Sequence, residues 1–139
     1  MKNTLVKEGT VKLIYRHFPF LGQESLMAAH ASECASDQGM FLKYREGLYL
    51  SWDKEEGSLY TPVHLSAIAD NLDMDTNEFN ECNYHQIHLN KIKSMYDEAH
   101  QLGVNSTPTT IIQGELISGL GSYEYYSEII DSKLRDQLQ

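Results

Sequence analysis

Residues Gly103–Thr109 read Gly-Val-Asn-Ser-Thr-Pro-Thr and mark the point where the sequence pattern changes. Before them, apolar residues recur at helical spacing, and Gly103 is a typical helix stop because glycine readily adopts the left-handed backbone that ends helices. After them, Thr109–Ile112 is a short β-type run, Gly114-Glu115 fits a hairpin turn, and Leu116-Ile117 begins a returning strand. The stretch therefore joins a long helix to a predicted β-hairpin.

A block of predicted helices precedes this stretch. Each helix is indicated by apolar residues three or four positions apart and by capping or breaking residues such as the Thr61-Pro62 pair and Asp75. In chain order we expect helices over 22–37, 40–52 and 63–72, a short one after Asp75, and a long one with Ile87, Ile92, Met95, Ala99 and Leu102 facing inward. A last amphipathic helix, capped by Ser122, follows the hairpin.

The first predicted element of the chain is a strand. In Val11–Phe18 (VKLIYRHF) the apolar residues Leu13, Ile14 and Tyr15 are contiguous, and Pro19 ends the run. A short β-branched and aromatic run of this kind is typical of a mostly buried strand. The order strand, several helices, hairpin, helix predicts an α/β domain with a helical block inserted before the hairpin.

The composition restricts the class of partner. The 139 residues have the size of one domain, with 41% hydrophobic and 22% charged residues. No run approaches the roughly 18 apolar residues that a membrane-spanning helix needs, so no membrane association is expected. Eleven Lys and Arg against 20 Asp and Glu give a net charge of −9, which repels phosphate and argues against nucleic acid.

Three segments, taken together in this order and spacing, carry a family resemblance. They are Gly9–Leu13 (GTVKL) running into Arg16–Pro19 (RHFP); Ala28-Ala29, Cys34-Ala35 and Gln38–Phe41 (QGMF); and Gly103–Thr109 followed by Gly114 and Gly119. This set resembles the DsbA-like branch of the thioredoxin fold, and the resemblance covers essentially the whole chain. It implies an α/β, thioredoxin-like fold in which residues 1–139 form a single domain with a helical insertion at about 22–103.

The resemblance also implies a chemistry. The family performs thiol–disulfide exchange, without a bound cofactor, through a Cys-x-x-Cys pair at the start of its first core helix. Thr107-Pro108 matches the family's cis-proline loop, which lies against that pair and holds the substrate peptide. Ser106, Thr107 and Pro108 are therefore the predicted substrate-binding residues. Only about 5–6% of X–Pro bonds are cis in general, so the expectation of a cis bond rests on the resemblance, and an ordinary trans turn is the alternative.

No Cys-x-x-Cys pair occurs in the 139 residues. In the family this pair and the first strand lie ahead of the segment that Leu5–Gly9 matches, so we expect a domain truncated at its N-terminus, without the first core strand and most of the first helix. Exchange needs an attacking thiolate and a second thiol to resolve the mixed disulfide. Cys34 lies well inside a predicted helix, and Cys82 is its one possible resolving partner. We therefore expect no catalytic residue, and no oxidoreductase activity, in this chain alone.

The loss of an interior strand would leave edge groups unpaired, which favours pairing with another chain. A homodimer is the expected outcome, while closure of the remaining strands, or a chain that is a fragment of a longer protein, are alternatives. Three functions stay open: an oxidoreductase seen without its active-site segment, a non-catalytic module that binds polypeptides by strand addition at the cis-proline loop, and a purely structural or oligomeric protein.

Both cysteines fall in the helical insertion, where some members of the resembled family carry a second, non-catalytic disulfide. A structural Cys34–Cys82 disulfide is therefore expected, with two buried free thiols as the alternative. Cys82, His85 and His88 follow one another at steps of three and could offer zinc ligands, but such steps drift about 60° each around a helix and no fourth ligand is evident, so no metal is expected. His30 lies four residues before Cys34 and could activate its thiol, but two residues at helical spacing are common by chance. The family and such a bridge suggest an extracytoplasmic or periplasmic compartment, although residues 1–7 show no secretory signal.

Overall fold

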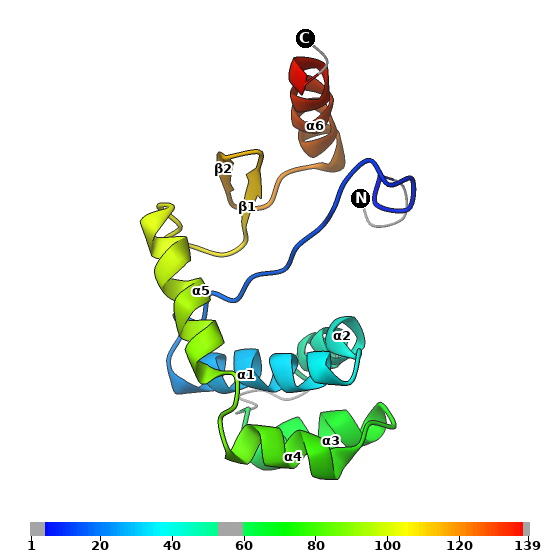
Figure 1. Cartoon of the computed structure of the whole chain (residues 1–139), viewed down its shortest axis with the longest axis vertical. Helices are drawn as coiled ribbons and strands as arrows, with labels where there is room; N and C mark the ends of the chain where they lie inside the picture. Colours follow the sequence, from blue (N-terminus) through cyan, green and yellow to red (C-terminus); the bar gives the residue numbers. More distant parts are fainter. Residues whose placement is uncertain (1–4, 53–59, 138–139) are drawn as a thin grey trace. The chain divides into compact units, whose positions relative to one another are not determined.

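The computed structural model describes residues 5–52 and 60–137. Its elements, labelled in Figure 1, are α1 (Gln23–Asp37), α2 (Phe41–Trp52), α3 (Pro62–Asn71), α4 (Thr76–Tyr84), α5 (Leu89–Gln101), β1 (Thr109–Ile112), β2 (Glu115–Ser118) and α6 (Tyr123–Gln137). Two compact units result, one over His17–Glu98 and the other from the remaining residues on either side. None of the described helices is long and apolar enough to cross a membrane.

The helical unit packs α1–α4 around one apolar core. Small residues on α1, namely Ala31 and Ala35, are fully buried and let neighbouring helices approach closely. The rings of Tyr44 on α2 and Phe79 on α4 fill the centre, with their centroids 5.2 Å apart. Where α2 meets α3 the approach is so close that a Cβ on Gly47 would lie 2.8 Å from the Ile68 side chain. The core therefore depends on small residues at the crossings as much as on large ones between them.

The predicted caps of this unit are confirmed. Thr61 precedes α3, and its side chain accepts a hydrogen bond from the backbone N–H of His64, while Pro62 occupies the first helical turn. Asp75 precedes α4 and accepts from the N–H of Glu78 at 3.0 Å. These side chains satisfy N–H groups that have no partner within the helix, which is why the helices begin at these residues.

The second unit contains an antiparallel hairpin of β1 and β2, in which Thr109 pairs with Ser118 and Ile112 with Glu115. The turn consists of Gln113 and Gly114, with φ angles of 47° and 83°. The prediction of a turn at Gly114-Glu115 is therefore wrong by one residue. A two-residue turn that matches the twist of the strands needs positive φ at both positions, and glycine at the second of them favours this register.

The last helix, α6, follows the hairpin and packs on it through Tyr126. This side chain is buried, and its hydroxyl accepts a hydrogen bond from the Gly121 N–H at 3.1 Å. The predicted cap is also confirmed, because the Ser122 side chain accepts from the N–H of Tyr125 at 3.1 Å. The aromatic cluster at the start of α6 is thus divided between one buried structural ring and the half-exposed rings of Tyr123 and Tyr125.

The predicted strand over Val11–Phe18 is not found. This segment has no regular secondary structure, and Ile14, expected to be buried, is 62% exposed. An apolar run makes a strand only when a neighbouring strand supplies hydrogen-bonding groups, and the described part of this unit contains no strand that pairs with it. The inward face predicted for α5 is also too broad, since Ile92 is buried but Ile87 and Leu102 are more than half exposed.

Candidate functional site

The loop before β1 gathers the three residues predicted to bind substrate. The Thr107–Pro108 peptide bond is cis, and both residues are exposed. Two hydrogen bonds fix the loop on the hairpin. The Thr109 hydroxyl donates to the Ser106 carbonyl at 2.7 Å, and the Gly119 N–H donates to the Pro108 carbonyl at 2.8 Å. Ser106, Thr107 and Pro108 are therefore presented by an ordered loop that continues directly into a strand.

The hydrogen-bond alternation of the hairpin decides which groups of β1 face away from β2. In a two-residue hairpin the residues next to the turn form a hydrogen-bonded pair, and such pairs then alternate with non-bonded ones. Ile112 and Thr110 therefore bond to β2, in agreement with the bond between Pro108 and Gly119. The N–H and C=O groups of Thr109 and Ile111 point outward, and among the described residues no backbone partner meets them.

The two cysteines are joined to each other in the helical unit. Cys34 on α1 and Cys82 on α4 form a disulfide with their Cα atoms 5.8 Å apart. Their residues are 1% and 5% exposed, and they belong to the main core cluster. Cys34 lies three residues before the end of α1 and Cys82 two residues before the end of α4. Neither sulfur therefore has the helix N-terminal environment that activates a thiol for attack.

His30 is held beside this disulfide in one tautomer. Its Nε2 accepts a hydrogen bond from the backbone N–H of His88 at 3.1 Å, so the proton resides on Nδ1. Nδ1 donates to the Asn83 side-chain oxygen at 3.1 Å and lies 3.7 Å from Cys34 Sγ. The ring thus ties α1 to α4 and to the segment that leads into α5. With both nitrogens engaged, it acts as a structural connector rather than as a base for Cys34.

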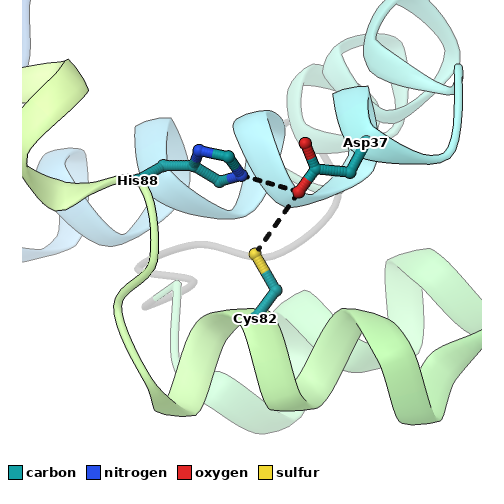
Figure 2. Close-up of side chains that lie close together, drawn as sticks. All are labelled: Asp37, Cys82 and His88. Atoms are coloured by element: carbon teal, nitrogen blue, oxygen red, sulfur yellow. Dashed lines mark hydrogen bonds and ion pairs between the residues drawn. The ribbon is translucent and has the colours of Figure 1, made fainter.

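Next to the Cys82 sulfur lies a pair of side chains, Asp37 and His88, that the sequence did not indicate. Figure 2 shows the side chains of Asp37, Cys82 and His88 pointing toward one another. His88 Nε2 is 2.6 Å from Asp37 Oδ2, and that oxygen is 3.9 Å from Cys82 Sγ. The second approach is a contact and not a hydrogen bond, because a disulfide sulfur carries no proton. Asp37 follows Cys34 by three residues, one helical turn, and this spacing could have indicated it.

His85, considered with Cys82 and His88 as a ligand, does not join this cluster. Its ring is exposed and pairs with Glu81 at 3.1 Å, one turn back along α4. The helix α4 ends at Tyr84, so His85 lies at its C-terminal cap and His88 in the turn that follows, and the three residues do not lie on one helix. The cluster that the fold creates instead takes its third member from α1.

A second cluster of ionisable side chains, His17, Glu33 and Lys91, lies in the helical unit. The buried carboxylate of Glu33 receives the His17 ring at 3.0 Å and the Lys91 ammonium on its other oxygen. Burial lowers the pKa of His17 below its ordinary value of 6.5, although the Glu33 charge acts in the opposite direction. This contact ties the segment before α1 to α1 itself and to α5.

Known proteins resemble this chain along nearly its whole length. The family model described as "Thioredoxin" matches residues 1–132. "Probable disulfide bond formation protein D" of Bacillus anthracis is 24% identical over 97% of this chain, which covers 63% of that protein. "Na(+)/H(+) antiporter NhaA 3" of Salinispora tropica is 28% identical over 95% of this chain, which covers 20% of that protein. The chain thus spans less than two thirds of these relatives.

A solved structure agrees on the fold. The thioredoxin-like oxidoreductase from Silicibacter pomeroyi DSS-3 superposes with a TM-score of 0.73 at 23% identity, over 88% of this chain and 68% of that one. The thioredoxin-like fold expected from the sequence is confirmed, and with it the resemblance carried by the three segments. The chain belongs to the thioredoxin family.

Proposed function

We propose that this chain is a DsbA-like protein that binds extended polypeptide segments and does not itself exchange disulfides. The observation that carries the proposal is the Ser106–Pro108 loop, in which Thr107 and Pro108 are exposed. The loop runs directly into a strand whose outer edge has no backbone partner among the described residues. An extended peptide can add to such an edge through main-chain hydrogen bonds, and neighbouring side chains then select the peptide. The proposed substrate contacts are Ser106, Thr107 and Pro108.

The cysteines support the second half of the proposal. Exchange requires a thiolate that a substrate disulfide can reach. Both sulfurs of this chain are bonded to each other and buried in a helical core, and the sequence offers no Cys-x-x-Cys pair. The purified chain should therefore fail to accelerate insulin reduction by dithiothreitol. Turnover that disappears in a Cys34→Ala/Cys82→Ala variant would contradict this part.

Two proline variants test the binding edge. Ile111→Pro removes an N–H that points outward from β1, while Leu116→Pro removes the equivalent N–H on the outer edge of β2, and neither group belongs to the β1–β2 hydrogen bonds. The two residues face each other across the hairpin, so they are matched for any effect on its stability. Weaker polypeptide binding in Ile111→Pro alone would support the edge of β1 as the site.

A second copy of the chain is the other candidate occupant of this edge, since unpaired strand edges also favour pairing between identical chains. Light scattering at micromolar concentration distinguishes the two. A dimeric mass that becomes monomeric in Ile111→Pro would assign the edge to a homodimer. A monomeric mass for both the wild type and Ile111→Pro would exclude a homodimer at the edge of β1 and favour polypeptide partners as its occupants.

The kinship with a disulfide bond formation protein also favours action outside the cytoplasm, where a disulfide such as Cys34–Cys82 persists. We propose an extracytoplasmic location on this basis. Recovery of the native chain with Cys34 and Cys82 oxidised, when free thiols are alkylated at lysis, would support it. A fully alkylated chain would speak against it.

A further inference from the structure

We propose that reduction of the Cys34–Cys82 disulfide creates a zinc site formed by Cys34, Cys82, Asp37 and His88. Three of the four donor atoms already lie within 4.8 Å of one another: a carboxylate oxygen of Asp37, Cys82 Sγ and a ring nitrogen of His88 (Figure 2). The fourth, Cys34 Sγ, is bonded to Cys82 Sγ. The site therefore needs no new element to be brought in. The bond between the two sulfurs has to break, and the sulfurs have to move apart from 2.02 Å to the spacing of zinc ligands.

The donor set fits zinc. Structural zinc is bound tetrahedrally by thiolate, imidazole and carboxylate groups at about 2.0–2.3 Å, which places donor atoms roughly 3.3–3.8 Å apart. The distance of 3.9 Å between Asp37 Oδ2 and Cys82 Sγ already approaches this value. The pair Asp37–His88, at 2.6 Å, has to open by about 1 Å to admit the ion between its atoms. Asp37 is exposed and its side chain can make that movement.

The reaction balances with a dithiol reductant. The dithiol gives two electrons and two protons to the disulfide, forms a disulfide itself and leaves Cys34 and Cys82 as thiols. Zn²⁺ then binds both sulfurs as thiolates and releases two protons. In the oxidised chain the same sulfurs are bonded to each other and carry no charge. Cys34 and Cys82 can therefore form either the disulfide or part of the zinc site, but not both at once.

Neighbouring groups hold the donors in place after reduction. His30 Nδ1 lies 3.7 Å from Cys34 Sγ, so its N–H, which donates to Asn83 in the oxidised chain, can be shared with a thiolate at Cys34 after reduction. The Nε2 of the same ring accepts the hydrogen bond from the His88 N–H. A single ring thus contacts one sulfur ligand and the segment that carries the imidazole ligand. Hydrogen-bonding partners of this kind orient the ligands and typically change metal affinity by 10–100-fold.

The test is a titration of the full chain with Co²⁺ and then Zn²⁺, with and without reduction by dithiothreitol followed by its anaerobic removal. The reduced chain should bind one equivalent of Co²⁺ with a near-ultraviolet thiolate-to-metal absorption that Zn²⁺ abolishes, and the oxidised chain should show none. Asp37→Asn and His88→Gln should each weaken binding by at least about tenfold. His85→Gln, which alters an exposed ring outside the cluster, should leave it unchanged.

A thermal melt keeps the proposal testable if reduction loosens the helical core. Zn²⁺ should raise the melting temperature of the reduced chain and leave that of the oxidised chain unchanged, because a ligand stabilises only the state that binds it. Absence of both the absorption and the melting shift in the reduced chain would overturn the proposal. Equal binding by the wild type, Asp37→Asn and His88→Gln would overturn it as well.

Discussion

The hydroxyl of Tyr44 donates a 2.9 Å hydrogen bond to the backbone carbonyl of Leu65, inside the helical core. Tyr44 is fully buried, and burial raises the pKa of its phenol well above the ordinary value of 10. The bond joins α2 to α3 at a point from which water is excluded. A polar group in such a place stabilises the fold only while its partner is kept.

Tyr44→Phe should therefore lower the free energy of unfolding by about 1–2 kcal/mol, because the Leu65 carbonyl loses its donor in a buried position. The change is measured by urea denaturation followed by far-ultraviolet circular dichroism. Tyr49→Phe is the matched control, since Tyr49 lies on the same helix and is 60% exposed. Equal effects of the two variants would show that the hydroxyl of Tyr44 contributes nothing.

Stability should fall as the pH is lowered through the range in which His17 titrates. Its pKa is depressed in the folded chain, so at a pH well above 6.5 the ring is neutral in both states and its contribution is complete. Below 6.5 the unfolded chain takes up the proton first, and the free energy of unfolding decreases until the folded chain is protonated too. Urea midpoints measured from about pH 7.5 to about pH 5 follow this decrease.

His17→Gln should flatten that pH profile while its amide keeps a hydrogen bond to Glu33. His85→Gln, at an exposed ring, should leave the profile as it is. A His17→Gln profile as steep as that of the wild type would show that His17 is not the source of the pH dependence.

Removal of the disulfide should destabilise the helical unit strongly. The bridge joins residues 48 positions apart, and in the chain-entropy model a closed loop of that length is worth up to about 4 kcal/mol. The double variant Cys34→Ala/Cys82→Ala should therefore melt at a lower temperature than the oxidised wild type in a metal-free buffer. Dithiothreitol should lower the melting point of the wild type and not that of the variant. Insensitivity of the wild type would mean that the bridge is absent in solution.

Tyr126 should prove to be a structural residue rather than part of a binding surface. Tyr126→Phe leaves the Gly121 N–H without its acceptor, so we expect a loss of about 1–2 kcal/mol and faster hydrogen exchange at that amide. Tyr125→Phe should change neither, because Tyr125 is 47% exposed. An unchanged Gly121 amide in Tyr126→Phe would show that the hydrogen bond does not form.

The elements that the sequence predicts well are those with local signals. Thr61, Asp75 and Ser122 begin helices because their side chains satisfy nearby N–H groups, and such contacts are visible within four residues of sequence. The failures involve partners that are distant in sequence. Ile14 was expected in a buried strand, but a strand depends on a neighbour that its own sequence does not specify.

The candidate sites show the same difference between contacts that are local in the sequence and contacts between distant residues. The loop Ser106–Pro108 could be singled out from the family resemblance because its residues are contiguous, and its role in binding stays a prediction. The cluster around the disulfide was found only in part, because Asp37 and His88 are 51 residues apart and meet through the packing of helices. His85 follows Cys82 at the same three-residue step, but its ring pairs with Glu81. The regular spacing in the sequence does not tell whether His85 or His88 lies beside Cys82. The folded structure shows that it is His88.

The most direct test of the account is the fluorescence anisotropy of a labelled, permanently unfolded polypeptide titrated with the wild-type chain, Ile111→Pro and Leu116→Pro. We expect the wild type and Leu116→Pro to bind with affinities within about twofold of each other, and Ile111→Pro to bind at least about tenfold more weakly. Binding that is equal in all three proteins, or absent from the wild type, would contradict the assignment of the β1 edge and the Ser106–Pro108 loop as a polypeptide site.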